Sequence, residues 1–537
     1  MIDNGLFPKT NIACTPLKWK GADYLLKTDA KQIEHCLHDI DTPFYILHTG
    51  SSIALATGGE ISPTGDYNCL GLIPAFNPEC LGSDAFKKAH GTNYAYQAGA
   101  MANGIASIDL VTSLGRKGYL SSFGAAGLPL KRVEEAITTL QATLHDAPYA
   151  FNLIHSPSEP NLERECVELY LKYGVKTVEA SAFMNLTPNI VYYRAAGLSQ
   201  GSHGEIIARN NIIAKISRRE VAEVFMKPAP DKILQDLVSK GLITTEQSAL
   251  AQKVPVASDI TVEADSAGHT DNRPLVCLLP LIQEIRNRIQ QEFKYEKNIR
   301  VGAGGGISTP QAALAAFAMG ADYIVTGSVN QACRESGASE IVKAALAQAD
   351  IVDFAMAPAA DMFEMGVKVQ VLKRGTLFAM RAQKLYEIYR QYDSIDEIPT
   401  LERKKIEEQL FQKDLDTVWD ETVQFFQERD PSQIQKASEN PKKKMALIFR
   451  WYLGKSSFWA KAGMQERKMD YQVWCGPAMG AFNEWVKDSY LEKPENRHVI
   501  DVAYHLMKGA AYLFRIRQLN SLGVNYVDSY GTYKVTP

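Results

Sequence analysis

The chain has 537 residues, which is enough for about two to four domains and a sizeable hydrophobic core. Its formal net charge of −3 excludes an overall attraction to nucleic acid or to an anionic membrane surface. No apolar run approaches the roughly 18 to 20 residues that span a bilayer, which excludes a membrane-spanning segment.

The cysteines and the N-terminus predict a cytoplasmic protein. The eight cysteines are scattered without a C-x-x-C pair, and no two histidines share a metal-binding spacing with a third ligand nearby. This pattern is typical of reduced thiols and predicts neither a disulfide framework nor a metal site. Residues 1–20 lack an apolar core behind a basic start, so they predict no secretory signal.

Residues 1–90 are predicted to form a small, separate N-terminal module. Residues 43–57, PFYILHTGSSIALAT, predict one or two strands because they are rich in β-branched and aromatic side chains. The segment that follows is rich in Gly, Pro and Asn, and we expect it to be a loop.

Residues 91–349 alternate short apolar strands with helices of about 10 to 15 residues. The strands are expected at residues 94–100, 118–124, 149–154, 175–181, 211–217, 259–265, 299–305 and 322–328. Alternation of this kind implies a parallel sheet, and eight such units over about 250 residues are typical of a closed (β/α)8 TIM barrel. Residues 228–258 predict a helical hairpin inserted between the fifth and sixth strands.

Residues 350–537 are predicted to form a helical C-terminal domain, because the alternation stops there. Residues 379–393 and 401–430 predict long helices, and a Trp- and Tyr-rich end follows. The predicted fold class is therefore α/β, a barrel between a small N-terminal module and a helical C-terminal domain.

Two glycine turns close the predicted barrel. The seventh strand runs into three consecutive glycines, Gly304–Gly306, and the eighth, Asp322–Thr326, ends in Gly327 and Ser328. Turns after the seventh and eighth strands of such a barrel commonly hold a phosphate through backbone N–H groups. Two ordinary tight connections are the alternative.

The helix between these strands has clear end signals. Ser308 or Thr309 can cap its N-terminus, and Pro310 suits its first turn. Gly320 fits a left-handed stop at its C-terminus.

The same glycines disfavour a Rossmann dinucleotide site. Such a site needs G-x-G-x-x-G, but counting from Gly302 and Gly304 the third position is Ile307. The acidic residue is also misplaced, because Asp322 begins the next strand and does not stand at its tip.

The ends of four other strands supply further candidate site residues. The first strand supplies Gly99–Met101, the third Asn152, the fifth Lys215, and the sixth Asp265–His269. All these ends converge on one mouth of the barrel with the glycine turns. A phosphorylated, planar, electron-carrying ring satisfies them together, and FMN is the simplest such ligand.

Each polar candidate also has a structural alternative. Asn152 is either a ligand-binding amide or a turn former at the strand end, and Lys215 either faces the mouth or points into water. Facing the mouth, Lys215 would place a positive charge near the pyrimidine end of the ring and stabilise the reduced flavin. His269 is either an acid or base or a loop cap. No G-x-S-x-G motif supports a serine nucleophile.

At this point the motifs resemble a known superfamily. Residues 97–101, 149–153, 212–222, 262–275, 302–310 and 320–331 resemble the nitronate monooxygenase and flavin enoyl reductase superfamily. Beyond the barrel, residues 356–387, 444–454 and 474–485 resemble the PfaD-type trans-acting enoyl reductases of polyunsaturated fatty acid and polyketide synthases. One position departs from the pattern, since Ala267 replaces the first of two glycines that usually precede the histidine.

The resemblance implies a set of site residues. His269 matches the catalytic histidine of the superfamily. Positions matching flavin-binding residues are Gly99, Ala100, Met101, Asn152, Lys215, Ser266, Gly268, Gly305, Gly306, Gly327 and Ser328.

The resemblance to these enoyl reductases also implies an activity and partners. The implied enzyme takes hydride from NADPH through FMN and reduces the 2,3 double bond of enoyl thioesters on acyl carrier protein domains of a multienzyme synthase. The basic residues that follow the barrel are expected either to dock the carrier, to hold the NADPH 2′-phosphate, or to form a solvated helix face; they are Lys368, Lys373, Arg374, Arg381 and Lys384. A nitronate monooxygenase-type flavin oxidase and a non-catalytic synthase subunit are the alternatives, and a homodimer stays open.

Overall fold

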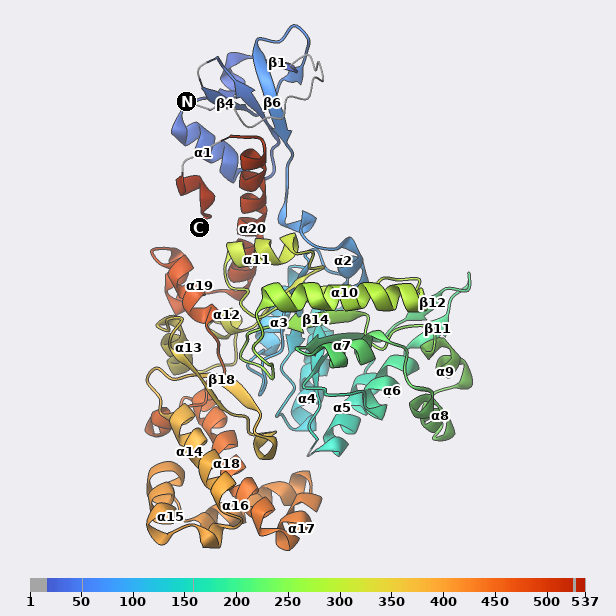
Figure 1. Ribbon diagram of the computed structural model, residues 1–537, viewed down its shortest axis with the longest axis vertical. Coiled ribbons are helices and arrows are strands. Elements are labelled where there is room, and N and C mark those ends of the chain that lie inside the picture. Colours follow the sequence, from blue (N-terminus) through green and yellow to red (C-terminus); the bar gives the residue numbers. More distant parts are fainter. Residues whose placement is uncertain (1–16, 51, 158, 525–527, 537) are drawn as a thin grey trace. The chain divides into compact units, whose positions relative to one another are not determined.

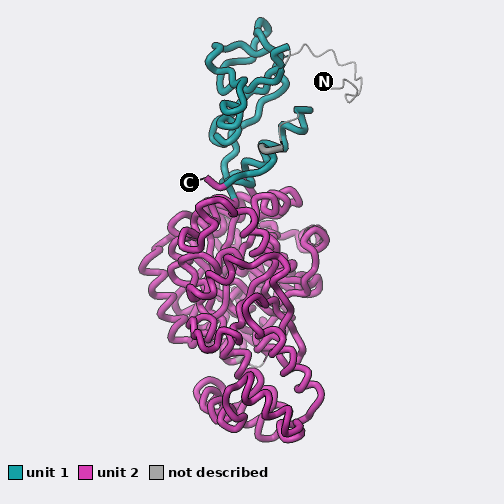
Figure 2. Tube along the Cα trace, turned by 90° about the vertical axis from the view of Figure 1, so that its left-hand side faces the viewer, with its two compact units in different colours: residues 1–80, 507–534 teal, residues 81–506, 535–537 magenta. Residues whose placement is uncertain are grey.

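The computed structural model describes residues 17–50, 52–157, 159–524 and 528–536. The described residues divide into two compact units (Figure 2). The first consists of the described residues up to Cys80 together with those between Met507 and Lys534, and the second consists mainly of those between Leu81 and Leu506. Residues 1–16, which include Cys14, lie outside the described residues. They form most of the N-terminal segment for which no secretory signal is predicted. The division at residues 90 and 349 stays a prediction.

The first unit contains an antiparallel sheet with strand order β2-β4-β3-β6-β1-β5. Its elements are β1 (Lys18–Lys20), β2 (Leu26–Lys27), α1 (Ala30–His38), β3 (Phe44–His48), β4 (Ile53–Ala56), β5 (Glu60–Ile61) and β6 (Tyr67–Ile73). Strands β3 and β4 confirm the expectation for residues 43–57. The loop expected after them is wrong, because β6 pairs with β3 on one side and β1 on the other. Pairing on both sides outweighs the low strand propensity of Asn68 and Gly71.

Both ends of the chain contribute to this unit. The Trp19 side chain is fully buried, and its Nε1 donates a hydrogen bond to the Gly58 carbonyl at 2.8 Å. Arg515, near the end of the last helix, donates to the Thr42 carbonyl at 2.7 Å and packs over the Phe44 ring. The C-terminal segment therefore completes the N-terminal unit.

The second unit confirms the predicted parallel barrel. Its closed strand order is β10-β13-β14-β15-β16-β7-β8-β9. The strands are β7 (Tyr96–Ala98), β8 (Leu120–Phe123), β9 (Ala150–Ile154), β10 (Thr177–Ser181), β13 (Asn211–Ile216), β14 (Asp259–Glu263), β15 (Arg300–Gly304) and β16 (Ile324–Thr326). Every barrel strand expected from the sequence is present.

Helices surround the barrel strands (Figure 1). They include α3 (Ile108–Arg116), α4 (Leu130–Leu144), α5 (Pro160–Lys172), α6 (Pro188–Ala196), α7 (Arg219–Met226), α10 (Leu275–Phe293), α11 (Pro310–Ala318), the short α12 (Ser328–Gln331) and α13 (Glu340–Ala347). The inserted hairpin is confirmed as α8 (Asp231–Ser239) and α9 (Thr245–Ala251). Of the two cap candidates, Thr309 accepts a hydrogen bond from the Ala312 N–H and begins α11. The hairpin that follows α6, β11 (Leu198–Gln200) and β12 (Ile206–Ala208), was not expected.

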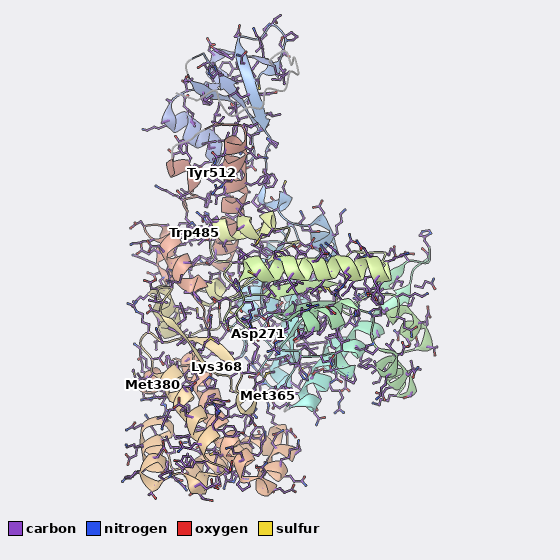
Figure 3. All side chains as sticks on the ribbon, viewed as in Figure 1. Asp271, Met365, Lys368, Met380, Trp485 and Tyr512 are labelled. Atoms are coloured by element: carbon purple, nitrogen blue, oxygen red, sulfur yellow. The ribbon has the colours of Figure 1, made fainter. Side chains whose placement is uncertain are left out.

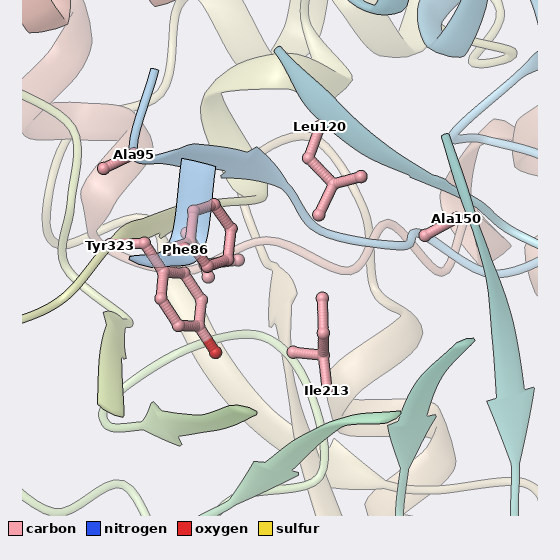
Figure 4. Packing of buried hydrophobic residues seen from close by; sticks show 7 residues of the cluster. Phe86, Ala95, Leu120, Ala150, Ile213 and Tyr323 are labelled. Carbon is pink, nitrogen blue, oxygen red and sulfur yellow. The ribbon is translucent and has the colours of Figure 1, made fainter. Parts of the chain in front are cut away.

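Helix α2 (Asp84–His90) packs against the N-terminal ends of the barrel strands. Its Phe86 ring stacks on Tyr323 at a centroid distance of 4.2 Å, next to Leu120 and Ala150 (Figure 4). Tyr323 directly precedes β16, and Leu120 and Ala150 begin β8 and β9. The cluster therefore closes the floor of the barrel opposite the mouth.

A buried charge cluster joins the same floor. Asp259 is fully buried and accepts two hydrogen bonds from Arg300, at 2.6 and 2.7 Å, while His90 Nε2 lies 3.1 Å from its Oδ2. Burial alone would raise the pKa of Asp259, but Arg300 and His90 outweigh it and hold the pKa below its ordinary value. The stabilisation of the folded state by the Asp259 carboxylate is complete above the ordinary carboxyl pKa. It is lost as pH falls through the lowered pKa of Asp259.

The C-terminal half of the second unit is mainly helical, as expected. Its helices are α14 (Phe378–Gln391), α15 (Thr400–Ile406), α16 (Leu415–Arg429), α17 (Ser432–Glu439), α18 (Pro441–Ala462), α19 (Ala478–Val486) and the start of α20 (Val499–Ser521). An unexpected antiparallel hairpin, β17 (Phe354–Pro358) and β18 (Lys368–Leu372), precedes them. Among the described residues, no helix is both long and apolar enough to cross a membrane.

Asp259→Ala is expected to lower the free energy of unfolding by about 3 to 5 kcal/mol, because it leaves the buried Arg300 without a counter-charge. Urea unfolding of the full chain measures this. Asp84→Ala is the control, since Asp84 pairs with Lys87 on the surface with 81% of its side chain exposed, and it should change little. Equal small effects of the two substitutions would show that the floor cluster does not stabilise the barrel.

Candidate active site

A cavity of about 800 Å³ lies at the C-terminal mouth of the barrel. It is walled by the ends of the barrel strands and by α16, α18 and residues 472–478 of the C-terminal half. The structure brings every predicted site residue into its lining, namely Gly99, Ala100, Met101, Asn152, Lys215, Ser266, Gly268, His269, Gly305, Gly306, Gly327 and Ser328. Their individual roles stay predictions.

The two glycine turns form a side-chain-free edge of this cavity. Gly305 and Gly306 have φ of 89° and 75°, in the left-handed region that favours glycine. A Cβ on Gly305 would lie 2.9 Å from the Asp265 carbonyl oxygen, whereas one on Gly306 or Gly327 would have no other atom within 4 Å. A ligand can therefore approach the backbone of both turns closely.

Lys215 faces the inside of the mouth, which settles the alternative left open by the sequence. Its Nζ lies 3.0 Å from Glu263 Oε1 and 3.5 Å from Glu179 Oε1. Burial alone would lower the pKa of Lys215, but the two carboxylates outweigh it and hold the pKa above its ordinary value. Lys215 is therefore a buried cation held between two anions.

Glu179 and Glu263 were missed by the sequence analysis. Glu179 is fully buried, accepts a hydrogen bond from Gln97 Nε2 at 2.6 Å, and accepts another from the Ala100 N–H at 3.2 Å. A carboxylate near the carboxyl end of an apolar barrel strand, as in VEAS and ITVE, is a signal that could have identified both.

Asn152 is buried within β9, so the reading of this residue as a turn former is wrong. Its Nδ2 donates to the Ser181 hydroxyl at 3.0 Å and to the Glu179 carbonyl at 3.2 Å. Both bonds orient the amide at the mouth, where the residue lines the cavity.

His269 pairs with Asp361, which lies in the loop after β17 and was also missed. His269 Nε2 is 3.1 Å from Asp361 Oδ1, and their side chains are 23% and 28% exposed. Burial alone would lower the pKa of His269, but Asp361 outweighs it and raises the pKa above its ordinary value. In turn, His269 holds the pKa of Asp361 below its ordinary value, although burial alone would raise it. The cavity thus contains an imidazole that carries a proton more readily than a free histidine.

The loop that carries His269 is fixed on both sides. A Cβ on Gly268 would lie 2.5 Å from Glu263 Oε1, so glycine lets the loop pass over this carboxylate. Asp271, labelled in Figure 3, accepts two hydrogen bonds from Arg218 at 2.7 and 2.9 Å. Ala267 lines the cavity beside them, and we find no further consequence of its methyl group.

The basic stretch that follows the barrel is largely neutralised. Arg374 pairs with Asp353, Arg381 with Asp470 and Lys384 with Glu402. Lys368, labelled in Figure 3, is exposed at the start of β18. These ion pairs weaken the expectation that the stretch acts as one anion-binding surface.

His269 is expected to titrate above the ordinary histidine pKa of about 6.5 in the parent protein. Asp361→Asn should lower that pKa, because the main carboxylate that opposes the effect of burial is then lost and only Glu263 remains. NMR titration of histidine side chains, with His269→Gln to assign the resonance, measures both values. A pKa unchanged by Asp361→Asn would contradict the pairing.

Two family models match parts of the chain. The model described as fatty acid synthase subunit PfaD N-terminal domain matches residues 19–75. The model described as acyl-carrier-protein S-malonyltransferase, inserted helical domain, matches residues 392–471, which include α15 to α18.

Similar proteins cover most of the chain. A polyunsaturated fatty acid synthase subunit of Thraustochytrium sp. is 52% identical over 91% of this chain, and polyketide biosynthesis protein PksE of Bacillus subtilis is 46% identical over 82%. The chain spans 33% and 57% of the lengths of these two relatives.

A solved structure is matched over almost its whole length. The crystal structure of the enoyl reductase domain of MlnA, from the macrolactin biosynthesis cluster of Bacillus amyloliquefaciens, superposes with a TM-score of 0.78 at 41% identity. The match covers 82% of this chain and 99% of that domain. The chain therefore belongs to the family of PfaD-type enoyl reductases of polyunsaturated fatty acid and polyketide synthases.

Proposed function

We propose that this protein is an FMN- and NADPH-dependent enoyl reductase. Its substrates are 2-enoyl thioesters on acyl carrier protein domains of a polyunsaturated fatty acid or polyketide synthase, on which it acts in trans. The similarity to the MlnA enoyl reductase domain supports the reaction class. The observation that carries the proposal is the single cavity in which the glycine turns, Lys215 and His269 meet.

The mouth of the barrel fits FMN. Gly305, Gly306, Gly327 and Ser328 would hold its phosphate, since the open backbone of these turns suits an anion. Gly99–Met101 and Asn152 would hold the ring. When bound, FMN supplies hydride transfer between NADPH and the substrate.

Lys215 has a narrower role than the sequence analysis expected. Two carboxylates share its charge at 3.0 and 3.5 Å, so it adds no net positive charge to the site. We expect Lys215 to act as a hydrogen-bond donor to the bound ring and to keep Glu179 and Glu263 in place.

His269 is the proposed proton donor. Reduction of the double bond adds hydride at the β-carbon and a proton at the α-carbon, while NADPH becomes NADP⁺. His269 delivers that proton, or donates a hydrogen bond to the thioester carbonyl as negative charge develops there. Asp361 orients the imidazole and raises its pKa above the ordinary value, so the activity should fall as pH rises through the His269 pKa.

As partners of this activity we propose acyl carrier proteins and a multienzyme synthase, and the similar proteins support this proposal. The names of the relatives refer to polyunsaturated fatty acid synthesis and polyketide biosynthesis. A cytoplasmic location, a homodimer and carrier docking by the basic stretch stay predictions.

The purified protein is expected to show a flavin absorbance spectrum that NADPH bleaches under anaerobic conditions. Spectra recorded before and after the addition of NADPH measure this. A flavin reduced by a nitroalkane substrate but not by NADPH would favour a nitronate monooxygenase. A colourless protein that FMN does not reconstitute would favour a non-catalytic synthase subunit.

His269→Ala should keep its flavin yet lose turnover by ~10²- to 10⁴-fold, the range typical of a lost general acid. Asp361→Asn should keep more activity but shift the alkaline limb of the pH–rate profile to lower pH. Steady-state rates with an enoyl thioester measure both effects. Turnover of His269→Ala at the parent rate would rule out the proposed role.

A further inference from the structure

One face of α18 is turned toward the cavity along most of the helix. Leu447, Trp451, Gly454, Phe458 and Lys461 recur at intervals of four and three residues, and all of them line the cavity. Residues at these intervals share one side of an α-helix. Such a stripe normally packs against protein. Leu447 does so, because it is buried against Phe426 and Ala437, but Gly454 and Phe458 further along the stripe are exposed.

Gly454 is the unusual residue of this stripe. It lies in the interior of α18, where glycine is less favourable than alanine. A Cβ at this position would meet no other atom within 4 Å, so neither packing nor a left-handed backbone requires glycine. The missing side chain instead widens the cavity at the surface of the helix.

Exposed aromatic side chains line the same cavity as Gly454. Phe458 on α18 is 56% exposed and Phe425 on α16 is 53% exposed, although both are large apolar groups. Trp451 lies one turn before Gly454 on the same face. Apolar surface of this kind inside a cavity is typical of a site for an apolar ligand.

Polar links hold both helices against the barrel on either side of this region. Asn103, in the loop after β7, donates from Nδ2 to the Ser457 hydroxyl at 3.2 Å and accepts from Lys461 through its carbonyl. On the other side, Arg429 of α16 forms an ion pair with Glu159, which precedes α5. The open region between these links is therefore framed by fixed helices.

We propose that Gly454, Phe425 and Phe458 form the subsite for the acyl chain of the substrate and set the chain length that the enzyme accepts. The chain would lie along the backbone of α18 at Gly454, with its thioester toward His269. This inference rests on the proposed function. It names the part of the cavity that binds the apolar end of that substrate.

Gly454→Leu tests the subsite directly. It should lower kcat/KM for a long-chain enoyl-pantetheine thioester by about 10- to 200-fold, the range for a misfit in a hydrophobic pocket, and leave crotonyl-pantetheine almost unchanged. Gly454→Ala adds little bulk and should keep both activities, with an unchanged or raised melting temperature. Ser438→Leu, which places the same side chain at an exposed position of α17, is the control.

Binding of saturated acyl-pantetheines, measured by calorimetry, gives a readout that does not depend on turnover. Gly454→Leu, and independently Phe458→Ala if the first variant fails to fold, should weaken binding of the long-chain thioester relative to the butyryl thioester. Equal long- to short-chain ratios in the parent and these variants would overturn the subsite. A parent protein that binds the long-chain thioester at Gly454 but reduces no enoyl thioester would overturn the proposed function alone.

Discussion

Closure of the parallel barrel is the constraint on which the site depends. The first and last strands, β7 and β16, pair side by side, and the Gly99 N–H donates to the Thr326 carbonyl at 2.9 Å where they end. This closure brings the carboxyl ends of strands that are far apart in the sequence to one mouth. At the opposite end, Phe86, Tyr323 and the Asp259–Arg300 pair close the floor, and the cavity of about 800 Å³ lies at the mouth.

Charge balance within the mouth is the second constraint. Lys215 is stable in a buried position because Glu179 and Glu263 flank it, and His269 keeps a raised pKa because Asp361 lies beside it. Asp361 belongs to the C-terminal half of the unit, as do the helices that wall the cavity. The Gly476 N–H, also from this half, donates to the Ser328 hydroxyl beside the second glycine turn at 3.3 Å. The C-terminal half therefore completes the site and does not merely follow the barrel.

Much of the barrel could be predicted from the sequence because its signals are local. Alternating strands and helices, the Gly304–Gly306 turn and the Thr309 cap each depend on neighbouring residues. The C-terminal hairpin β17–β18 was missed because helical sequence surrounds it. Strand β6 was missed because its pairing with β1 and β3 overrides its composition.

The candidate site was predicted less completely, because part of it depends on long-range pairing. His269 and Asp361 are 92 positions apart, and nothing near either residue indicates the other. The direction of Lys215 could not be read from the alternation of its strand, and it became clear only with Glu179 and Glu263 in place. Gly454 carried no local signal, since its meaning depends on the space in front of it.

The central claim is that this cavity passes hydride from a bound flavin to an enoyl thioester. The most direct measurement reduces the protein anaerobically with NADPH, removes the excess, and mixes it with crotonyl-pantetheine in a stopped-flow spectrometer. The account predicts that the absorbance of oxidised flavin returns at once and that the saturated thioester forms in an amount equal to the flavin that is re-oxidised. A flavin that stays reduced until oxygen is admitted would contradict it.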